Sequence, residues 1–322
     1  MPIGKIKRFL SVVLILGSIW LIGHHLTTHQ EDFKQTLRLN LKDQILLIIL
    51  YLAIHQLSAL KIFFLLKKLK AKKIPYWEWF KIFTVSRFAN LHVTQGANIY
   101  RSIKLKHEYG FSYTQSFGLV TIFTWFECMV VFVASGILLV MNPMGTAAVK
   151  NPLLLTLLSV TVIFGILPWA ARGISKNLSF TNKSIQAFHA NLNEMFNLFT
   201  ACLNDTRLIL KIFMVSLISF YLNLWWVLVT FRSIGVDVNL GFLTVFGLII
   251  FLSKTFNIVP GNLGLRELAC GYLGKSVGWG LTEGIVVSAI TRVVEYGVIT
   301  ILGIVFAKRI FIRKKFSSMK NT

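Results

Sequence analysis

Long apolar blocks recur along the chain and are separated by short polar or basic segments. Most of the blocks approach the roughly 20 mostly apolar residues that a helix needs to cross a bilayer. None of them alternates apolar with polar residues, as the strands of a membrane barrel do. We therefore predict an all-α, polytopic membrane protein. The seven blocks lie at residues 9–26, 44–66, 116–141, 153–171, 208–231, 242–256 and 284–307.

Residues 184–203 follow a different pattern, in which apolar side chains recur every three or four positions. Such spacing places them on one face of a helix, with polar residues on the other. An amphipathic helix of this kind is typical of a membrane surface. We predict an interfacial helix on the cytoplasmic leaflet, whose apolar face consists of Phe188, Leu192, Met195, Phe199 and Cys202.

The composition agrees with a membrane protein, because 55% of the residues are hydrophobic and only 14% are charged. Soluble domains are nearer one quarter charged. The net charge of +22 would suit nucleic-acid binding, but lysine and arginine cluster just outside the apolar blocks, where membrane topology places them. We expect no nucleic-acid partner. The three cysteines are far apart, so we predict no disulfide framework, metal site or cofactor.

The distribution of basic residues predicts the orientation of the chain. Cytoplasmic segments are rich in lysine and arginine, which places the N-terminus, residues 61–73 and the tail after residue 307 inside. Seven crossings would put that tail outside. The block at 242–256 is short and runs into Pro260 and Gly261, so we predict that residues 242–280 form a broken, re-entrant hairpin. Six spans then remain, with both termini cytoplasmic and an uncleaved first span at 9–26 in the plasma membrane.

A short motif around this break occurs twice. Ser86, Arg87, Asn90, Gly96 and Arg101 recur as Ser253, Lys254, Asn257, Gly261 and Arg266. Chance similarity is one explanation. The charge pattern favours another, in which a first hairpin at 78–106 enters from the cytoplasm and the second enters from outside. Two opposed broken hairpins are typical of inverted-repeat transporters. Because helix N-termini and arginines attract anions, we predict a mid-membrane site for an anionic headgroup.

Three further ionisable residues lie within predicted spans, where charge is costly and suggests function. Glu127 lies in the block at 116–141, and we predict that it pairs with an arginine of a hairpin. Arg292 and Glu295 lie three residues apart on one face of the last span, close enough to pair with each other. No set of residues characteristic of a hydrolase or nucleotide-binding site occurs, so we predict no catalytic residues.

Residues 260–267, which follow Asn257, resemble the P-G-G-L-G-x-R-E signature of the lysylphosphatidylglycerol synthase transmembrane family, with Asn262 where glycine is usual. The earlier motif and Arg292 are also similar to that family, although Ala97 stands where glutamate is usual. The resemblance covers about residues 4–315. It implies a lipid-translocating membrane domain, which in some relatives precedes a soluble transferase and in others is linked to polyprenyl-linked or dolichyl-linked sugars.

We interpret residues 1–322 as one flippase-like domain that moves or binds an anionic phospholipid or a polyprenyl-phosphate-linked saccharide. The chain ends soon after the basic tail, which favours moving a lipid over making one. Two alternatives remain: an integral-membrane transferase that uses Glu267, and a non-catalytic partner of a separate cytoplasmic synthase or glycosyltransferase. A homodimer is also open. The predicted substrate-binding residues are Arg266, Glu267, Arg101, Asn257, Asn90, Gly261, Gly264, Gly96, Arg87, Glu127, Arg292 and Glu295.

Overall fold

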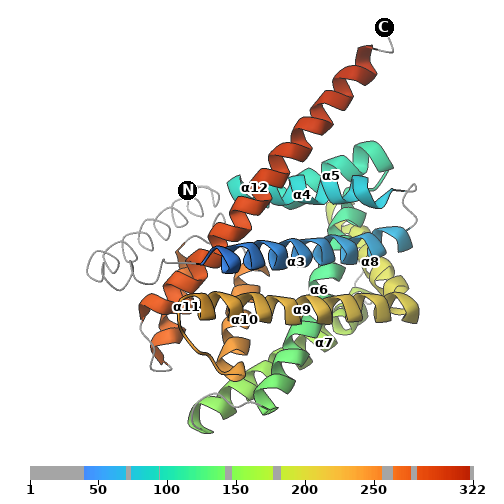
Figure 1. Ribbon diagram of the computed structural model, residues 1–322. Helices are drawn as coiled ribbons and strands as arrows, with labels where there is room; N and C mark the ends of the chain where they lie inside the picture. The colour runs from blue at the N-terminus through green and yellow to red at the C-terminus, as the bar shows by residue number, and fades with distance from the viewer. Residues whose placement is uncertain are drawn as a thin grey trace, which may run out of the picture. The chain divides into compact units, whose positions relative to one another are not determined.

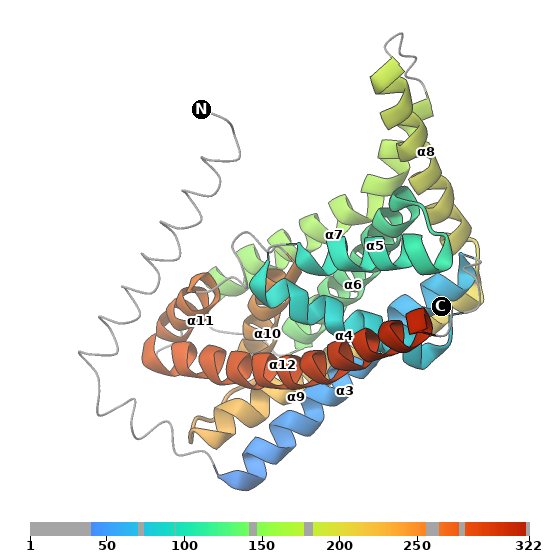
Figure 2. The same ribbon diagram turned by 90° about the horizontal axis from the view of Figure 1, so that it is seen from above.

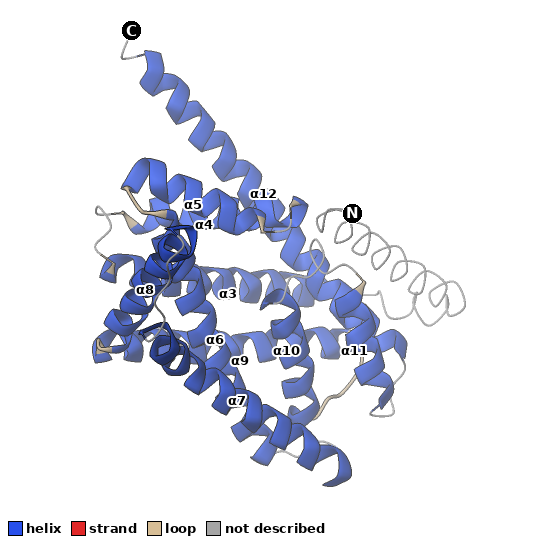
Figure 3. Cartoon of the chain, turned by 180° about the vertical axis from the view of Figure 1, so that it is seen from behind, coloured by secondary structure: helices blue, strands red, loops and turns tan. Residues whose placement is uncertain are grey.

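The computed structural model describes residues 40–69, 74–93, 95–141, 147–176, 183–255, 264–276 and 281–319, and within these ranges it contains helices and loops but no strand (Figure 3). The prediction of an all-α protein is confirmed. The ten described helices are α3 (Leu41–Lys68), α4 (Tyr76–His92), α5 (Gly96–Tyr109), α6 (Tyr113–Met141), α7 (Ala147–Lys176), α8 (Lys183–Leu203), α9 (Thr206–Ser233), α10 (Leu240–Thr255), α11 (Leu265–Ser276) and α12 (Leu281–Met319).

Four of these helices are long and apolar enough to cross a membrane. They are α3, α6, α9 and the part of α12 at Leu281–Lys308, and they contain four of the predicted apolar blocks. Helix α7 holds a shorter apolar stretch, Leu154–Ala170, and α10 is a mostly apolar helix of 16 residues. The predicted span at 9–26 lies outside the described residues. Helices of this length and composition belong to an integral membrane protein.

The two predicted hairpins each overlap a pair of consecutive helices, and their re-entrant course stays a prediction. Residues 93–95 separate α4 from α5, and residues 256–264 separate α10 from α11. At the first break Gln95 has a φ of 66°. The next residue must be glycine, because a Cβ on Gly96 would lie 2.6 Å from the carbonyl oxygen of Ala89. At the second break Gly264 has a φ of 82°, a conformation that favours glycine.

The helices group into two compact units, which we describe separately. The first unit contains α3 up to Ile54, residues Arg87–Gly96 and the chain from Leu222 onward. In this unit α11 packs along α12 (Figure 1). The two backbones approach so closely that a Cβ on Gly284 would lie 2.3 Å from the carbonyl oxygen of Cys270. Helix α11 is therefore seated directly on the backbone of α12.

An apolar core joins α3, α9 and α12 within the first unit. It is formed by Leu47, Leu50, Tyr51, Ile54, Trp226, Val229, Val286, Ile290, Val298 and Ile299. The side chain of Phe88 packs on this core and lies so close to α12 that a Cβ on Gly303 would stand 2.6 Å from it. The close approach at Gly303 holds the end of α4 against α12, which positions the neighbouring Arg87.

The second unit contains His55–Ser86 and Ala97–Tyr221, and its largest contacts are made by α6 with α7 and α8 (Figure 2). The indole Nε1 of Trp125 donates to the carbonyl oxygen of Phe164 at 2.8 Å, and its ring lies 5.0 Å from that of Phe199. Phe199 and Cys202 of α8 are buried. The helix predicted at 184–203 is therefore present, with part of its apolar face packed on protein, while its position at a membrane surface stays a prediction.

A buried ion pair crosses the second unit. Lys61 of α3 is almost wholly buried and donates to Glu127 of α6, which also accepts a hydrogen bond of 3.0 Å from the hydroxyl of Ser216 on α9. The partner of Glu127 is thus a lysine of α3, whereas we had predicted an arginine of a hairpin. Lysine was overlooked because Lys61 lies at the margin of an apolar block, where the sequence reads as a membrane border.

Helix α9 begins with a side-chain cap. Asp205 accepts a hydrogen bond of 2.6 Å from Lys68 and one of 3.0 Å from the backbone N–H of Leu208. The hydrogen bond from Lys68 and the N–H groups at the start of α9 lower the pKa of Asp205. An aspartate at this position satisfies a backbone donor that has no partner within the helix.

Candidate functional site

Six ionisable side chains of the first unit gather between α10, α11, α12 and the end of α4. We call this group the Glu295 cluster; its members are Arg87, Lys254, Arg266, Glu267, Arg292 and Glu295. Four of them are buried. Ionised groups in such a place must be paired or hydrogen-bonded to be tolerated. We therefore describe the ion pairs and hydrogen bonds of each member, because they indicate its structural role.

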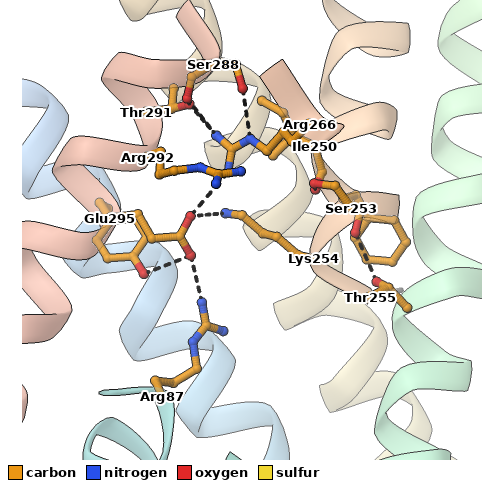
Figure 4. A network of polar contacts seen from close by, with 12 residues as sticks. Arg87, Ile250, Ser253, Lys254, Thr255, Arg266, Ser288, Thr291, Arg292 and Glu295 are labelled. Atoms are coloured by element: carbon orange, nitrogen blue, oxygen red, sulfur yellow. Dashed lines mark hydrogen bonds and ion pairs between the residues drawn. The ribbon is translucent and has the colours of Figure 1, made fainter. Parts of the chain in front are cut away.

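Glu295 of α12 lies at the centre of the cluster, where cations approach it from three sides (Figure 4). Its Oε1 accepts hydrogen bonds from Arg87 Nη2 at 3.0 Å and from the hydroxyl of Tyr51 at 3.3 Å. Its Oε2 lies 3.1 Å from Lys254 Nζ and 3.6 Å from Arg266 Nη1. A single carboxylate thus pairs with cations that come from three different segments of the chain.

Arg266 of α11 directs its guanidinium group at α12. Its Nε donates to Ser288 Oγ at 3.1 Å, and its Nη2 donates to the carbonyl oxygen of Ser288 at 3.2 Å and to the hydroxyl of Thr291. The side chain is 4% exposed. These contacts use the planar fork of donors that distinguishes arginine from lysine. Arg266 therefore fastens α11 to α12.

Glu267 has two partners, one local and one on α12. Its Oε2 accepts a hydrogen bond of 2.9 Å from the N–H of Gly264, three residues earlier. This is the reach of a glutamate in a capping box, which satisfies the N–H of the residue that caps the helix. Its Oε1 lies 2.9 Å from Arg292 Nε. Arg292, whose spacing would also allow a pair with Glu295, thus pairs with Glu267, and Glu295 pairs with three other cations.

The charges in the cluster do not balance. Four cationic side chains face two carboxylates, so the described residues of the cluster carry two positive charges in excess. The sequence of the intervening segment at 256–263 adds no ionisable residue. The N-terminus of α11 lies beside Arg266 and Glu267 and adds positive electrostatic potential to the cluster. An excess of positive charge at low dielectric favours the binding of an anion.

The two motif copies contribute equivalent residues to the same carboxylate. Arg87 and Lys254 hold the same position in the repeated motif, and they contact opposite oxygens of Glu295. The preceding serines also behave alike. Ser86 and Ser253 each donate to the carbonyl oxygen three residues earlier, at 2.6 and 2.7 Å.

Four residues of the site were absent from the sequence prediction. Lys254 could have been found, since it aligns with Arg87 in the repeat. Tyr51, Ser288 and Thr291 carry no sequence signal of their own. Tyr51 reaches the Glu295 cluster because its ring packs 5.4 Å from that of Trp226. Lys254 Nζ faces the same indole ring at 5.2 Å. The two aromatic rings form an apolar wall beside the charges.

The remaining predicted residues lie outside this group. Asn90 is half-buried on α4, and Gly96 begins α5. Arg101 belongs to the second unit, where it bonds within its own helix to the carbonyl oxygen of Ala97 at 3.2 Å and to Asn98 Oδ1 at 2.7 Å. A shared role of Arg101 and Glu127 with the Glu295 cluster stays a prediction. Asn257 and Gly261 lie outside the described residues.

Comparison with known proteins supports the resemblance seen in the motifs. The family model for the lysylphosphatidylglycerol synthase TM region matches residues 8–303. The match covers most of the chain, both copies of the repeated motif and every member of the Glu295 cluster. No curated protein and no solved structure matches the chain. The family match indicates a function related to membrane lipids.

Proposed function

This chain belongs to the lysylphosphatidylglycerol synthase transmembrane-region family, and on that premise we propose that it is a flippase-like transporter that binds an anionic lipid headgroup and carries it across the membrane. The cargo is an anionic phospholipid or a polyprenyl-phosphate-linked saccharide. The headgroup enters the Glu295 cluster. The observation that carries the proposal is the cluster's excess of two positive charges.

The exposure of the cations supports binding at this place. The side chains of Arg87 and Lys254 are 34% and 28% exposed, whereas Arg266 is 4% exposed and Arg292 8%. The excess charge therefore includes two cations that a ligand can reach. On a surface that faces bulk water, two such cations would be solvated and screened by salt, and they would not need a bound anion. The phosphate group of a lipid can supply a counter-charge to these two cations.

The helix pattern supports a matching topology. We propose six crossings by the segment at 9–26, α3, α6, α7, α9 and α12, with α4–α5 and α10–α11 as two opposed re-entrant hairpins, both termini cytoplasmic and a multi-pass position in the plasma membrane. The breaks at 93–95 and 256–264 support the hairpins, because interrupted helices at membrane depth are tolerated where they line a polar interior. Opposed hairpins would allow alternate access from the two sides.

A transport assay tests the proposal directly. The purified chain is reconstituted into liposomes that contain fluorescent phosphatidylglycerol, fluorescent phosphatidylcholine or a fluorescent short-chain prenyl phosphate. A membrane-impermeant quencher then reports the fraction of probe in the outer leaflet. We expect the chain to accelerate the exchange of at least one anionic probe and not that of phosphatidylcholine. Rates equal to those of protein-free liposomes for every anionic probe would refute the proposal.

A variant pair links transport to the cluster. Lys254→Gln is expected to slow the exchange of the anionic probe, because it removes a reachable cation. Lys275→Gln, which removes an exposed lysine from the same unit, serves as the matched control and is expected to leave the rate unchanged. Turnover of a labelled sugar donor by the purified chain would instead favour the transferase, and co-purification with a cytoplasmic synthase would favour the partner.

A further inference from the structure

The Glu295 cluster contains a ready-made contact for one phosphate group. Arg87 Nη2 and Lys254 Nζ lie 3.0 and 3.1 Å from the two oxygens of a single carboxylate. Carboxylate and phosphate present their oxygens to cations in a similar way, and both accept charge-assisted hydrogen bonds. Two cations that hold one carboxylate are therefore already positioned to hold one phosphate.

Glu295 can release these two cations without becoming an isolated charge. Its Oε2 also lies 3.6 Å from Arg266 Nη1, and its Oε1 accepts the hydroxyl of Tyr51. Arg266 is fixed to Ser288 and Thr291, so it stays in place when the other two cations turn to a ligand. A displaced Glu295 thus keeps a cationic partner and a hydrogen-bond donor.

The charge balance then selects the class of ligand. A phosphodiester headgroup carries one negative charge and would leave one positive charge uncompensated in the cluster. A phosphomonoester has a second pKa near 6 and carries close to two negative charges above that pH. A diphosphate bridge between a lipid and a sugar also carries two. Because an uncompensated charge in a partly buried site is costly, the excess of two positive charges favours a doubly charged group.

We propose that Arg87 and Lys254 together receive a lipid-borne phosphate or diphosphate group that carries two negative charges, and that Glu295 holds these two cations as an internal counter-anion until that group displaces it. The inference rests on the proposed function, since it takes the ligand to be the headgroup of the transported lipid. Beyond the proposed function, the headgroup is assigned two negative charges, and Arg87 and Lys254 are assigned as the residues that contact it.

A charge series with one pair of tails tests the ligand class on the wild-type chain. Binding to the detergent-purified protein is measured at pH 7 with dioctanoyl phosphatidic acid, dioctanoyl phosphatidylglycerol and dioctanoyl phosphatidylcholine, which differ only in the headgroup. We expect phosphatidic acid to bind about 10-fold or more tightly than phosphatidylglycerol, as the gain of charge-assisted contacts implies, and phosphatidylcholine to bind no more tightly than either. Equal affinity for the first two lipids would overturn the proposal.

Two further probes identify the source of the phosphate. Farnesyl phosphate carries the same headgroup charge as phosphatidic acid on a prenyl chain, so tighter binding of farnesyl phosphate would assign the site to a polyprenyl carrier. Inorganic phosphate has no lipid part. We expect it to bind at least about 10-fold more weakly than either lipid, since it buries no apolar tail. Equal affinity for inorganic phosphate would overturn the assignment to a lipid.

Variants test the exchange with Glu295. Arg87→Gln and Lys254→Gln are each expected to weaken phosphatidic acid binding about 10-fold, the effect of losing one charge-assisted contact. Their matched controls are Arg232→Gln and Lys275→Gln, which remove exposed cations of the same unit and should leave the affinity unchanged. Glu295→Gln removes the competitor, so it should tighten binding of phosphatidic acid and slow its release.

The sign of the Glu295→Gln effect separates the exchange from a structural role. A carboxylate that only supports the fold would weaken binding when it is removed, and that result would overturn the exchange. If Glu295→Gln does not fold, the lipid charge series on the wild-type chain and the Arg87→Gln and Lys254→Gln variants still test which ligand binds and which cations hold it. Transport of phosphatidylglycerol by a chain that shows no preference for doubly charged lipids would refute this inference while the proposed function stands. No transport and no binding of any anionic lipid would refute both.

Discussion

Replacing Arg266 by lysine tests whether its guanidinium group fastens α11 to α12 or is reserved for a ligand. The substitution keeps the positive charge and removes the fork. Arginine makes three hydrogen bonds here, to Ser288 Oγ, to the carbonyl oxygen of Ser288 and to Thr291 Oγ1. A lysine ammonium at the end of a differently shaped chain can replace about one of them. We therefore expect Arg266→Lys to destabilise the protein.

The expected size follows from these contacts. Hydrogen bonds that involve a charged group contribute about 1.5 kcal/mol or more each, so the loss of two amounts to about 3 kcal/mol. Unfolding entropy near 60 °C is about 2.1 cal/mol/K per residue, which for 322 residues gives roughly 0.7 kcal/mol/K. The unfolding temperature should therefore fall by about 4 °C.

The assay is thermal unfolding of the detergent-purified chain, followed by the fraction that remains monodisperse after heating. Arg232→Lys is the matched control, because Arg232 is exposed in the same unit and its replacement should shift the unfolding temperature by less than about 1 °C. An unchanged unfolding temperature in Arg266→Lys together with weaker lipid binding would refute the reasoning. In that case the donors of Arg266 would serve the ligand, as the sequence alone had suggested.

Three further predictions concern other parts of the fold. Gly284→Ala should lower stability by about 2 kcal/mol, because the new Cβ would lie 2.3 Å from a backbone oxygen. Gly297→Ala on the same helix is the control; its Cβ would enter open space, so it should be neutral or slightly stabilising. Unfolding curves of both variants measure the difference, and equal stabilities would contradict the close packing at Gly284. Lys61→Met and Glu127→Gln should each lower the free energy of unfolding by about 3 kcal/mol, and the double variant should lower it by clearly less than the sum of the two. Additive effects would show that the buried ion pair is not coupled. The lowered pKa of Asp205 means that its ionised form stabilises the folded state above the ordinary aspartate pKa near 3.9, and that this contribution is lost as the pH falls through the folded pKa. The difference in unfolding temperature between wild type and Asp205→Asn should therefore shrink from pH 5 to pH 3, and a constant difference would contradict the assignment.

The membrane helices could be predicted from the sequence because their signal is local. Blocks of apolar residues at 44–66, 116–141, 208–231 and 284–307 each exceed what a soluble helix requires, and each lies within one described helix of spanning length. The helix starts at Gly96 and directly after Gly264 could be predicted for the same reason. Glycine and proline interrupt helices through the backbone itself, as the close approach at Gly96 illustrates.

The partners within the Glu295 cluster could not be predicted, because they depend on packing between distant segments. Tyr51 and Glu295 lie 244 positions apart, and nothing in either neighbourhood specifies the other. The spacing of Arg292 and Glu295 favoured a pair on one helix face. The structure instead turns Arg292 to Glu267, since α11 lies directly against α12 at Gly284. Helix periodicity predicts which residues share a face, and tertiary packing determines which of them meet.

As the internal counter-anion proposed above, Glu295 would limit how tightly the cluster can hold a ligand. Without this carboxylate the four cations would face Glu267 alone, and the excess would rise from two positive charges to three. In the proposed exchange, Glu295 stabilises the ligand-free fold by the same contacts through which it would compete with an anion. A variant that binds the headgroup more tightly by loss of Glu295 should accordingly be less stable when empty and gain more stability from the ligand, because binding to the folded state raises stability by mass action. The proposed transport would require this compromise, since a headgroup that is bound too tightly is not released on the other side.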